Sequence, residues 1–140
     1  MRMAYLVVAD AANQGPSGKL NALGLGVRVI NPTRLPAVVP LTILAQAEAS
    51  SDELGEHPFK VSLEAPGRKV MTLVEDRLTV SERAADEAGL PIEFRAQVGF
   101  PFVAEKAGKY IIRLEIGRLK ASYPFLVKAP SVAEPSAEGE

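Results

Sequence analysis

The side chain with the widest chemical use in this sequence is His57, because the chain contains one histidine and no cysteine. A Ser-His-Asp or Cys-His site needs a base beside its nucleophile, and His57 is the one residue that could be that base. It lies between Glu56 and Pro58, at what we interpret as the junction of a loop and a strand. We therefore expect an exposed loop histidine and a protein that is not an enzyme.

Metal chemistry is limited by the same composition. Zinc and copper sites draw mainly on Cys and His ligands, so we expect no transition metal and no cofactor. Calcium would need several oxygen ligands that converge from loops. The side chains that could supply them are not grouped by any Asp-rich spacing: Asp10, Asn13, Asp52, Glu53 and Asp76. We interpret Asp10 instead as capping the turn over 13–18.

Sugar and phosphate sites are also disfavoured. A carboxylate pair for glycoside hydrolysis could come from different strands. However, the chain has no tryptophan, and its tyrosines fall mostly on expected core positions, which leaves no exposed aromatic platform for a sugar. The sequence GPSGK at 15–19 lacks both the GxxxxGK[ST] spacing of a phosphate-binding loop and a following helix.

The composition indicates one globular domain, with 140 residues of which 47% are hydrophobic and 24% charged. The net charge is −1 and the basic residues are scattered, so we expect no nucleic-acid partner. No apolar run approaches the roughly 18 residues that span a bilayer, so we expect no membrane partner. We interpret the apolar stretch 3–9 as a strand rather than a signal peptide. A chain without cysteine fits a cytoplasmic protein, which is the location we expect.

The clearest structural signal is a β-hairpin over 108–128, GKYIIRLEIGRLKASYPFLVK. Gly117 and Arg118 suit the two-residue loop of a type II′ turn, and this turn fixes the register of the two strands. In that register apolar residues face one another across the hairpin: Ile116 and Leu119, Leu114 and Ala121, Ile112 and Tyr123, and Tyr110 and Phe125. One face of the hairpin is therefore predicted to be core.

Pro124 restricts the second strand of this hairpin. In the predicted register it lies opposite Ile111, with its nitrogen directed away from the first strand. Because proline has no N–H group to donate to a third strand, we predict that 119–128 is an edge strand or carries a bulge.

Six further strands are predicted from alternating apolar residues and from the turn residues between them. They cover about 3–10, 19–30, 38–49, 59–65, 69–80 and 92–102. The first is apolar on both faces, which favours a central or well-covered strand. In the second, Leu23 and Leu25 share an expected inward row, while Gly24 and Gly26 indicate a bulge or the close approach of another group.

These segments together predict an all-β fold, a two-sheet Greek-key β-sandwich of about eight strands. Residues 81–90 would form one short helix or crossover between the sheets, because Ser81 can cap a helix and Gly89 can end one. We assign residues 1–129 to the β-sandwich domain and residues 130–140 to a disordered acidic tail.

Several turn and strand residues carry a resemblance to a known family: Ala9-Asp10, Gly18-Lys19-Leu20-Asn21, Gly24, a proline-bounded strand, Gly55-Glu56-His57-Pro58 and Gly108-Lys109-Tyr110. Over most of residues 3–128 the chain resembles a family of small uncharacterised bacterial proteins, described as a domain of unknown function. This resemblance implies a β-sandwich and carries over no activity, cofactor or site residue. The Gly-x-Tyr start of a late strand is also similar to immunoglobulin-like sandwiches, although their Cys pair and Trp are absent.

Two functional hypotheses follow: a non-enzymatic binding or protein-interaction module, and a structural subunit of a larger phage-like or particle-forming assembly. An enzyme of unknown type is the third alternative. Several stretches are apolar on both faces, which is more apolar surface than one inward sheet face needs, so we expect a protein partner or a homo-oligomer. The candidate interaction surface consists of six apolar residues: Leu35, Val38, Val39, Leu41, Phe100 and Phe102.

Overall fold

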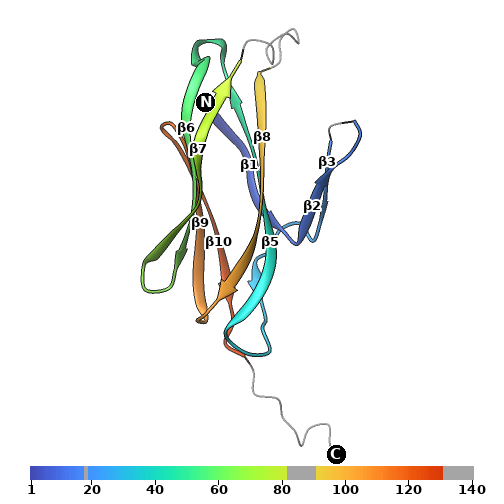
Figure 1. The fold of residues 1–140 in the computed structure, drawn as a ribbon, viewed down its shortest axis with the longest axis vertical. Helices are drawn as coiled ribbons and strands as arrows, with labels where there is room; N and C mark the ends of the chain where they lie inside the picture. The colour runs from blue at the N-terminus through green and yellow to red at the C-terminus, as the bar shows by residue number, and fades with distance from the viewer. Residues whose placement is uncertain (18, 82–90, 131–140) are drawn as a thin grey trace, which may run out of the picture.

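Strands form almost all of the regular structure in the computed structural model of this chain (Figure 1). The structure describes residues 1–17, 19–81 and 91–130. Its strands are β1 (Arg2–Ala9), β2 (Ala11–Gln14), β3 (Leu20–Leu23), β4 (Val29–Ile30), β5 (Ala37–Ala49), β6 (Gly55–Ala65), β7 (Lys69–Val80), β8 (Ile92–Ala104), β9 (Gly108–Ile116) and β10 (Leu119–Val127). A short 3₁₀ helix, η1 (Ser51–Glu53), lies between β5 and β6.

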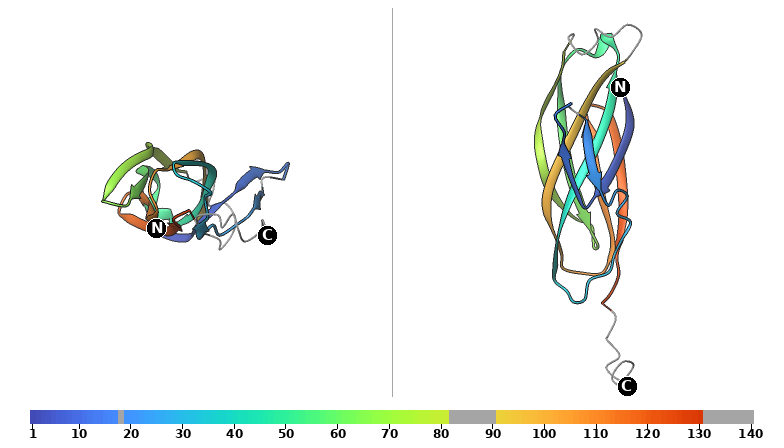
Figure 2. Two further views of the ribbon diagram at one scale, coloured as in Figure 1. Left: turned by 90° about the horizontal axis from the view of Figure 1, so that it is seen from below. Right: turned by 90° about the vertical axis from the view of Figure 1, so that its right-hand side faces the viewer.

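Two sheets pack face to face and enclose the core (Figure 1, Figure 2). One has three strands in the order β1-β5-β8, and the other has five in the order β4-β10-β9-β6-β7. The third sheet is the hairpin of β2 and β3, which projects from the sandwich in Figure 1 and in the left view of Figure 2. The predicted all-β fold with packed sheets is confirmed, whereas the Greek-key connectivity stays a prediction.

Two predicted segments fall on parts of the chain that the structure does not describe. The expected helix or crossover near 81–90 lies, except for Ser81, outside the described residues. The expected acidic tail over 130–140 lies outside them from residue 131 onward. Both assignments therefore stay predictions.

The inner faces of the two large sheets supply the core, because side chains alternate between the two faces of a strand. The core includes Leu41 and Ile43 from β5, Val61 from β6, and Ile112 and Leu114 from β9. Each of these five side chains is at most 1% exposed. Full burial of such a side chain contributes about 1.5–3 kcal/mol, so the facing sheets are the main source of stability.

Three aromatic rings connect the two sheets at the end where β8 leads into β9. Phe102 lies edge-on to Tyr110 and Phe125, with ring centroids 4.9 and 5.2 Å apart. The rings of Tyr110 and Phe125 stack at 5.6 Å. Phe102 belongs to the three-stranded sheet and the other two to the five-stranded sheet, so this cluster holds the sheets together at this end.

The hairpin of β9 and β10 has the predicted register. All four apolar pairs are present: Ile116–Leu119, Leu114–Ala121, Ile112–Tyr123 and Tyr110–Phe125. Gly117 has a φ of 58°, as the first loop position of a type II′ turn requires. Over most of its length β10 is an edge strand, as Pro124 predicted, because β4 pairs only with Leu126 and Val127.

The first strand, β1, is an edge strand, so the central position considered from the sequence is wrong. Its last two residues, Val8 and Ala9, are nevertheless fully buried. The N–H groups of Gly26 and Val27 both donate to the Val8 carbonyl, at 2.8 and 2.9 Å, and so close this edge. The two apolar faces of β1 are explained by a loop that folds over it rather than by a second neighbouring strand.

The predicted strand over 19–30 is two strands, β3 and β4, separated by a bend. Gly24 and Gly26 have φ angles of 65° and 88°, a left-handed conformation that ends the alternation of faces. The expected inward row is therefore wrong at Leu23 and Leu25, which are 72% and 62% exposed. The expected close approach is confirmed, because a Cβ on Gly24 would overlap the Asp10 carboxylate.

We expect Gly117→Val to destabilise the domain by about 1–3 kcal/mol, because a β-branched residue resists the positive φ at this position. The new Cβ would lie 3.6 Å from the His57 ring, an ordinary contact, so the cost comes from the backbone. Arg118→Val is the matched control, since the φ of Arg118 is not positive. Urea unfolding compares the two variants, and equal midpoints would contradict this turn geometry.

Candidate functional site

The six residues predicted to form an interaction surface do not lie together on the surface. Leu41 and Phe102 face the core and are 1% and 0% exposed, so their assignment to a contact surface is wrong. Three others are half-buried and pack against the same core: Leu35, Val39 and Phe100. The alternation of side chains along β5 and β8 turns Val39, Leu41, Phe100 and Phe102 inward, whereas Leu35 lies before β5 begins. Of the six, Val38 is the strongly exposed one, at 65%.

Val38 belongs to an exposed apolar group on the outer face of the three-stranded sheet. It pairs with Val103 of β8, which is 49% exposed. The next pair on the same face is Pro40 with Pro101, and both prolines are exposed. We call these four residues the proline–valine patch. Val38 and Pro40 are distant in the sequence from Pro101 and Val103. The β5–β8 register was therefore needed to identify the four residues as one patch.

The paired prolines also define the free edge of β8. Neither proline has an N–H group, so the pair suits a ladder position where the nitrogen atoms point away from the partner strand. The Pro40 nitrogen then points past the end of β1, whose pairing with β5 stops at Thr42. The Pro101 nitrogen points to the outer edge of β8, where no described strand is paired.

A second candidate surface arises because the two sheets differ in width. Met71 of β7 pairs with Leu63 of β6, which is buried in the core, so Met71 also faces the inner side of its sheet. Met71 is nevertheless 57% exposed. The three-stranded sheet does not extend far enough to cover the lower part of β7, which therefore overhangs it.

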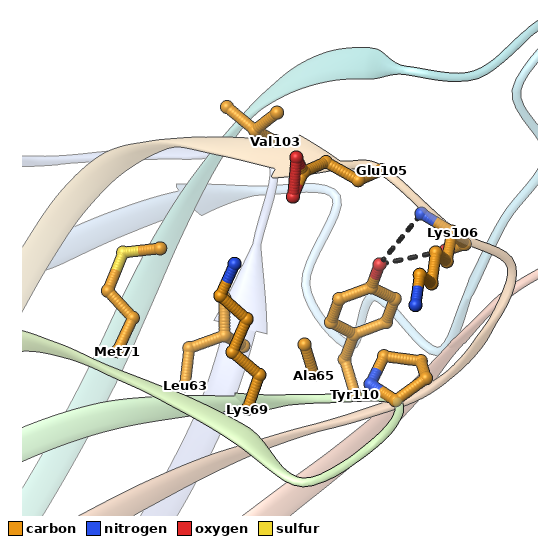
Figure 3. A pocket seen from close by; sticks show the side chains of 9 residues that line it. Leu63, Ala65, Lys69, Met71, Val103, Glu105, Lys106 and Tyr110 are labelled. Atoms are coloured by element: carbon orange, nitrogen blue, oxygen red, sulfur yellow. Dashed lines mark hydrogen bonds between the residues drawn. The ribbon is translucent and has the colours of Figure 1, made fainter.

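A pocket of about 140 Å³ lies beneath this overhang, at the end of the sandwich where the β6–β7 turn and the β8–β9 loop meet (Figure 3). Most of its lining is apolar or aromatic: Leu63, Ala65, Pro66, Met71, Val103 and Tyr110. Met71 and Val103 are both about half exposed at its mouth. Because most of this lining is apolar, the pocket is suited to an apolar group from another molecule.

Three charged side chains complete the lining of the pocket: Lys69, Glu105 and Lys106. Figure 3 shows Lys69 and Glu105 extending from opposite sides of it. Within the described part of the chain, none of the three forms an ion pair. Two ammonium groups against one carboxylate leave a net positive charge, which favours an anionic group at the mouth.

The wall formed by the β8–β9 loop is held in place by two contacts. The Tyr110 hydroxyl donates to the Lys106 carbonyl at 2.8 Å and accepts from the Lys106 N–H at 3.4 Å. Gly108, with a φ of 137°, lies so close to Pro66 that a Cβ would be 2.8 Å from the Pro66 Cγ. The loop is thus packed against the β6–β7 turn, and the pocket is preformed.

The opposite end of the sandwich carries His57, which lies on β6 and is half-buried, so the expected exposed loop histidine is wrong. Its Nε2 lies 2.7 Å from the Glu53 carbonyl oxygen. The Glu53 carboxylate lies 2.5 Å from the Met1 ammonium group and accepts a hydrogen bond from the Ser50 N–H. These contacts, the ammonium group first, lower the pKa of Glu53 to about 2. The cluster ties η1 to β6 and to the start of the chain.

The candidate calcium ligands are not brought together. Among the residues that the structure describes, no three His, Asp or Glu side chains are grouped so that they could hold a metal ion. The Asp10 carboxylate lies against Gly24, at the base of the projecting hairpin. None of the described helices is long and apolar enough to cross a membrane.

Comparisons with known proteins give one family match and one distant structural similarity. A family described as "Family of unknown function (DUF6941)" matches residues 4–128. No curated protein matches the chain. Among solved structures, the chain is similar to a β-glucosidase from Listeria innocua in complex with isofagomine, with a TM-score of 0.44 and 10% identity. The match covers 91% of this chain but 16% of the β-glucosidase chain.

We expect Tyr110→Phe to loosen the pocket wall, because the hydroxyl joins Tyr110 to Lys106. Stability should fall by about 1 kcal/mol, and amide hydrogen exchange over 105–107 should accelerate. Tyr123→Phe is the matched control: the Tyr123 hydroxyl donates to the Val27 carbonyl at 2.7 Å, and burial raises its pKa. That variant should lose similar stability without faster exchange in the loop. Equal exchange in both variants would show that the hydroxyl does not hold the wall.

Proposed function

We propose that this chain, which belongs to the family of unknown function DUF6941, is a non-enzymatic interaction module that binds an extended segment of a partner protein. The segment would add as a strand to the free edge of β7 at residues 69–72, next to the pocket. Strand addition of this kind gains affinity from main-chain hydrogen bonds and specificity from pockets for alternate side chains. The main evidence for this proposal is which sheet edges have backbone groups that are free to pair with another strand.

Each of the other sheet edges of the sandwich carries at least one feature that opposes pairing with another strand. The end of β1 is closed by the N–H groups of Gly26 and Val27. The edge of β8 is interrupted by Pro101, and that of β10 by Pro124. Strand β4 has only two residues. Short strands, prolines and covering loops are the usual devices that prevent pairing with another chain.

The upper half of β7 is protected as well. The pairing with β6 shifts at Leu73, which forms a bulge in β7. Glu75, Asp76 and Arg77 follow the bulge, and all three are exposed. Bulges and charged residues both oppose the addition of a strand.

The lower third of β7, residues 69–72, lacks these devices except for the charge on Lys69. Val70 and Met71 are 58% and 57% exposed, and no proline lies between Lys69 and Thr72. Among the described residues, β7 pairs with β6 and with no other strand. The four residues therefore present a short apolar edge that can accept a strand.

The direction of the backbone groups supports the same position. The Gly117 N–H donates to the Pro58 carbonyl at 2.9 Å, so the backbone groups of Pro58 point toward β9. Backbone groups alternate along a strand, so those of Glu64 also point toward β9 rather than toward β7. Val70 pairs with Glu64. The N–H and C=O groups of Val70, and those of Thr72 two residues later, therefore point away from β6 and are free to pair.

The test uses the purified full chain and a displayed library of random peptides. Peptides selected on the protein should bind in an extended form and protect the amides of Val70 and Thr72 from hydrogen exchange. The double variant Val70→Pro/Thr72→Pro removes two outward donors and keeps the β6–β7 ladder. It should weaken binding by roughly tenfold or more, since each hydrogen bond contributes about 1 kcal/mol.

Glu75→Pro is the matched control, because Glu75 pairs with Lys60 and its N–H also points outward, but in the protected half of β7. It should bind the selected peptides as the parent does. Thermal melting verifies that all variants are folded. Failure to select any peptide, or peptides that bind the double variant and the parent equally, would refute the proposed function.

The alternative function, a structural subunit of a larger assembly, is favoured by the proline–valine patch and by the projecting β2–β3 hairpin. An isolated two-stranded hairpin is only marginally stable in water, and a neighbouring copy would support it. In that case, sedimentation at micromolar concentration should show an oligomer. Val38→Glu/Val103→Glu should convert it to monomer, whereas a monomeric parent protein would contradict the alternative.

A further inference from the structure

We infer that the partner segment is recognised by an apolar side chain that is followed or preceded, two residues away, by a carboxylate. This inference rests on the proposed strand addition at β7 and specifies the chemistry of the segment. The pocket beneath Met71 would take the apolar side chain, and Lys69 and Lys106 would meet the carboxylate.

The position of the pocket follows from the geometry of an added strand. Residues that lie opposite each other on neighbouring strands point to the same face of the sheet. Met71 points to the inner face, as its pairing with the buried Leu63 requires. A partner residue opposite Met71 would point to the same face and would reach the pocket beneath Met71.

The size of the pocket distinguishes a side chain from a larger ligand. Sites for drug-sized ligands have volumes of roughly 300–1,000 Å³, whereas a cavity of about 150 Å³ holds a molecule such as benzene. The observed volume of about 140 Å³ corresponds to the second case. One leucine, methionine or phenylalanine side chain is therefore the fitting occupant, with Leu63, Ala65 and Tyr110 around it.

The charges at the mouth specify the neighbouring residue. Lys69 comes from β7 itself and Lys106 from the β8–β9 loop, and Glu105 is the one acidic residue of the lining. The balance of one positive charge disfavours a cationic partner and favours an anionic one. Side chains two residues apart on a strand share a face, so a carboxylate two positions from the apolar residue lies at the same mouth.

The contacts that hold the β8–β9 loop in place give the pocket a fixed shape. Tyr110 fixes Lys106 through both its backbone groups, and Gly108 packs directly on Pro66. A preformed pocket loses little conformational entropy when it is filled, so even a short peptide can gain affinity from a single anchor.

The experiment measures binding of three acetylated and amidated nine-residue peptides, built on a Thr-Val repeat, to the intact protein. Their central residues are Leu-Thr-Glu, Leu-Thr-Lys and Ala-Thr-Glu. The Leu-Thr-Glu peptide should bind roughly tenfold tighter than Ala-Thr-Glu, since burial of a large apolar side chain alone accounts for a factor of this size. It should also bind tighter than Leu-Thr-Lys, because the net positive charge at the mouth favours a carboxylate over an ammonium group. Fluorescence anisotropy gives the affinities.

A second experiment repeats the binding measurements with variants of the protein in which the charges at the mouth are reversed. Lys69→Glu/Lys106→Glu should reverse the preference, so that Leu-Thr-Lys binds tighter than Leu-Thr-Glu. Lys69→Gln/Lys106→Gln should remove the preference without reversing it. The matched control is Lys109→Glu, an exposed lysine next to Tyr110 on the other face of β9, which should leave the preference unchanged.

The outcomes separate this inference from the proposed function. Equal binding of the three peptides, or a preference that survives the double charge reversal, would overturn the inference. The proposed function would still stand in that case if library peptides of another type lost affinity through Val70→Pro/Thr72→Pro. Conversely, a Leu-Thr-Glu preference that depends on both lysines, together with loss of affinity in the double proline variant, supports both.

Discussion

A five-stranded sheet packs against a three-stranded sheet, and this difference in width determines where the molecule is closed and where it is open. The apolar inner faces must be buried, and Leu41, Ile43, Val61, Ile112 and Leu114 achieve this where the sheets overlap. Beyond the overlap an inward-facing side chain has nothing to pack against. The lower part of β7 lies there, and the same alternation that builds the core leaves an inward-facing apolar residue exposed.

The second constraint is that backbone groups at a sheet edge must be paired, covered or made unable to pair. This chain uses a different device at each edge. A loop folds over the end of β1, prolines interrupt β8 and β10, and a bulge with charged residues protects the upper part of β7. Segment 69–72 differs from these positions, because it has no bulge, no proline and no covering loop, and this difference is why we propose it as the binding edge.

The sequence was sufficient to predict local pairing but not the arrangement of non-adjacent strands. The hairpin of β9 and β10 was correct to the residue because Gly117 fixes its turn and Pro124 restricts its outer edge. Periodicity showed which residues of β8 share a face, but it did not show that Phe102 faces the core. The pocket was missed entirely, because its walls come from four strands and their connections, and the width of each sheet decides whether Met71 is covered.

The pairing of Pro40 with Pro101 has a consequence for how the longest strand pair aligns while the chain folds. A slip by one residue would turn every side chain of β8 to the opposite face of the sheet. It would also turn the Pro101 nitrogen toward β5, at a position where the ladder needs an N–H donor and proline has none. The misaligned pairing would thus lose both apolar burial and a hydrogen bond. The two prolines therefore discriminate between alternative alignments of β5 and β8 through the backbone alone, independently of which side chains the core selects.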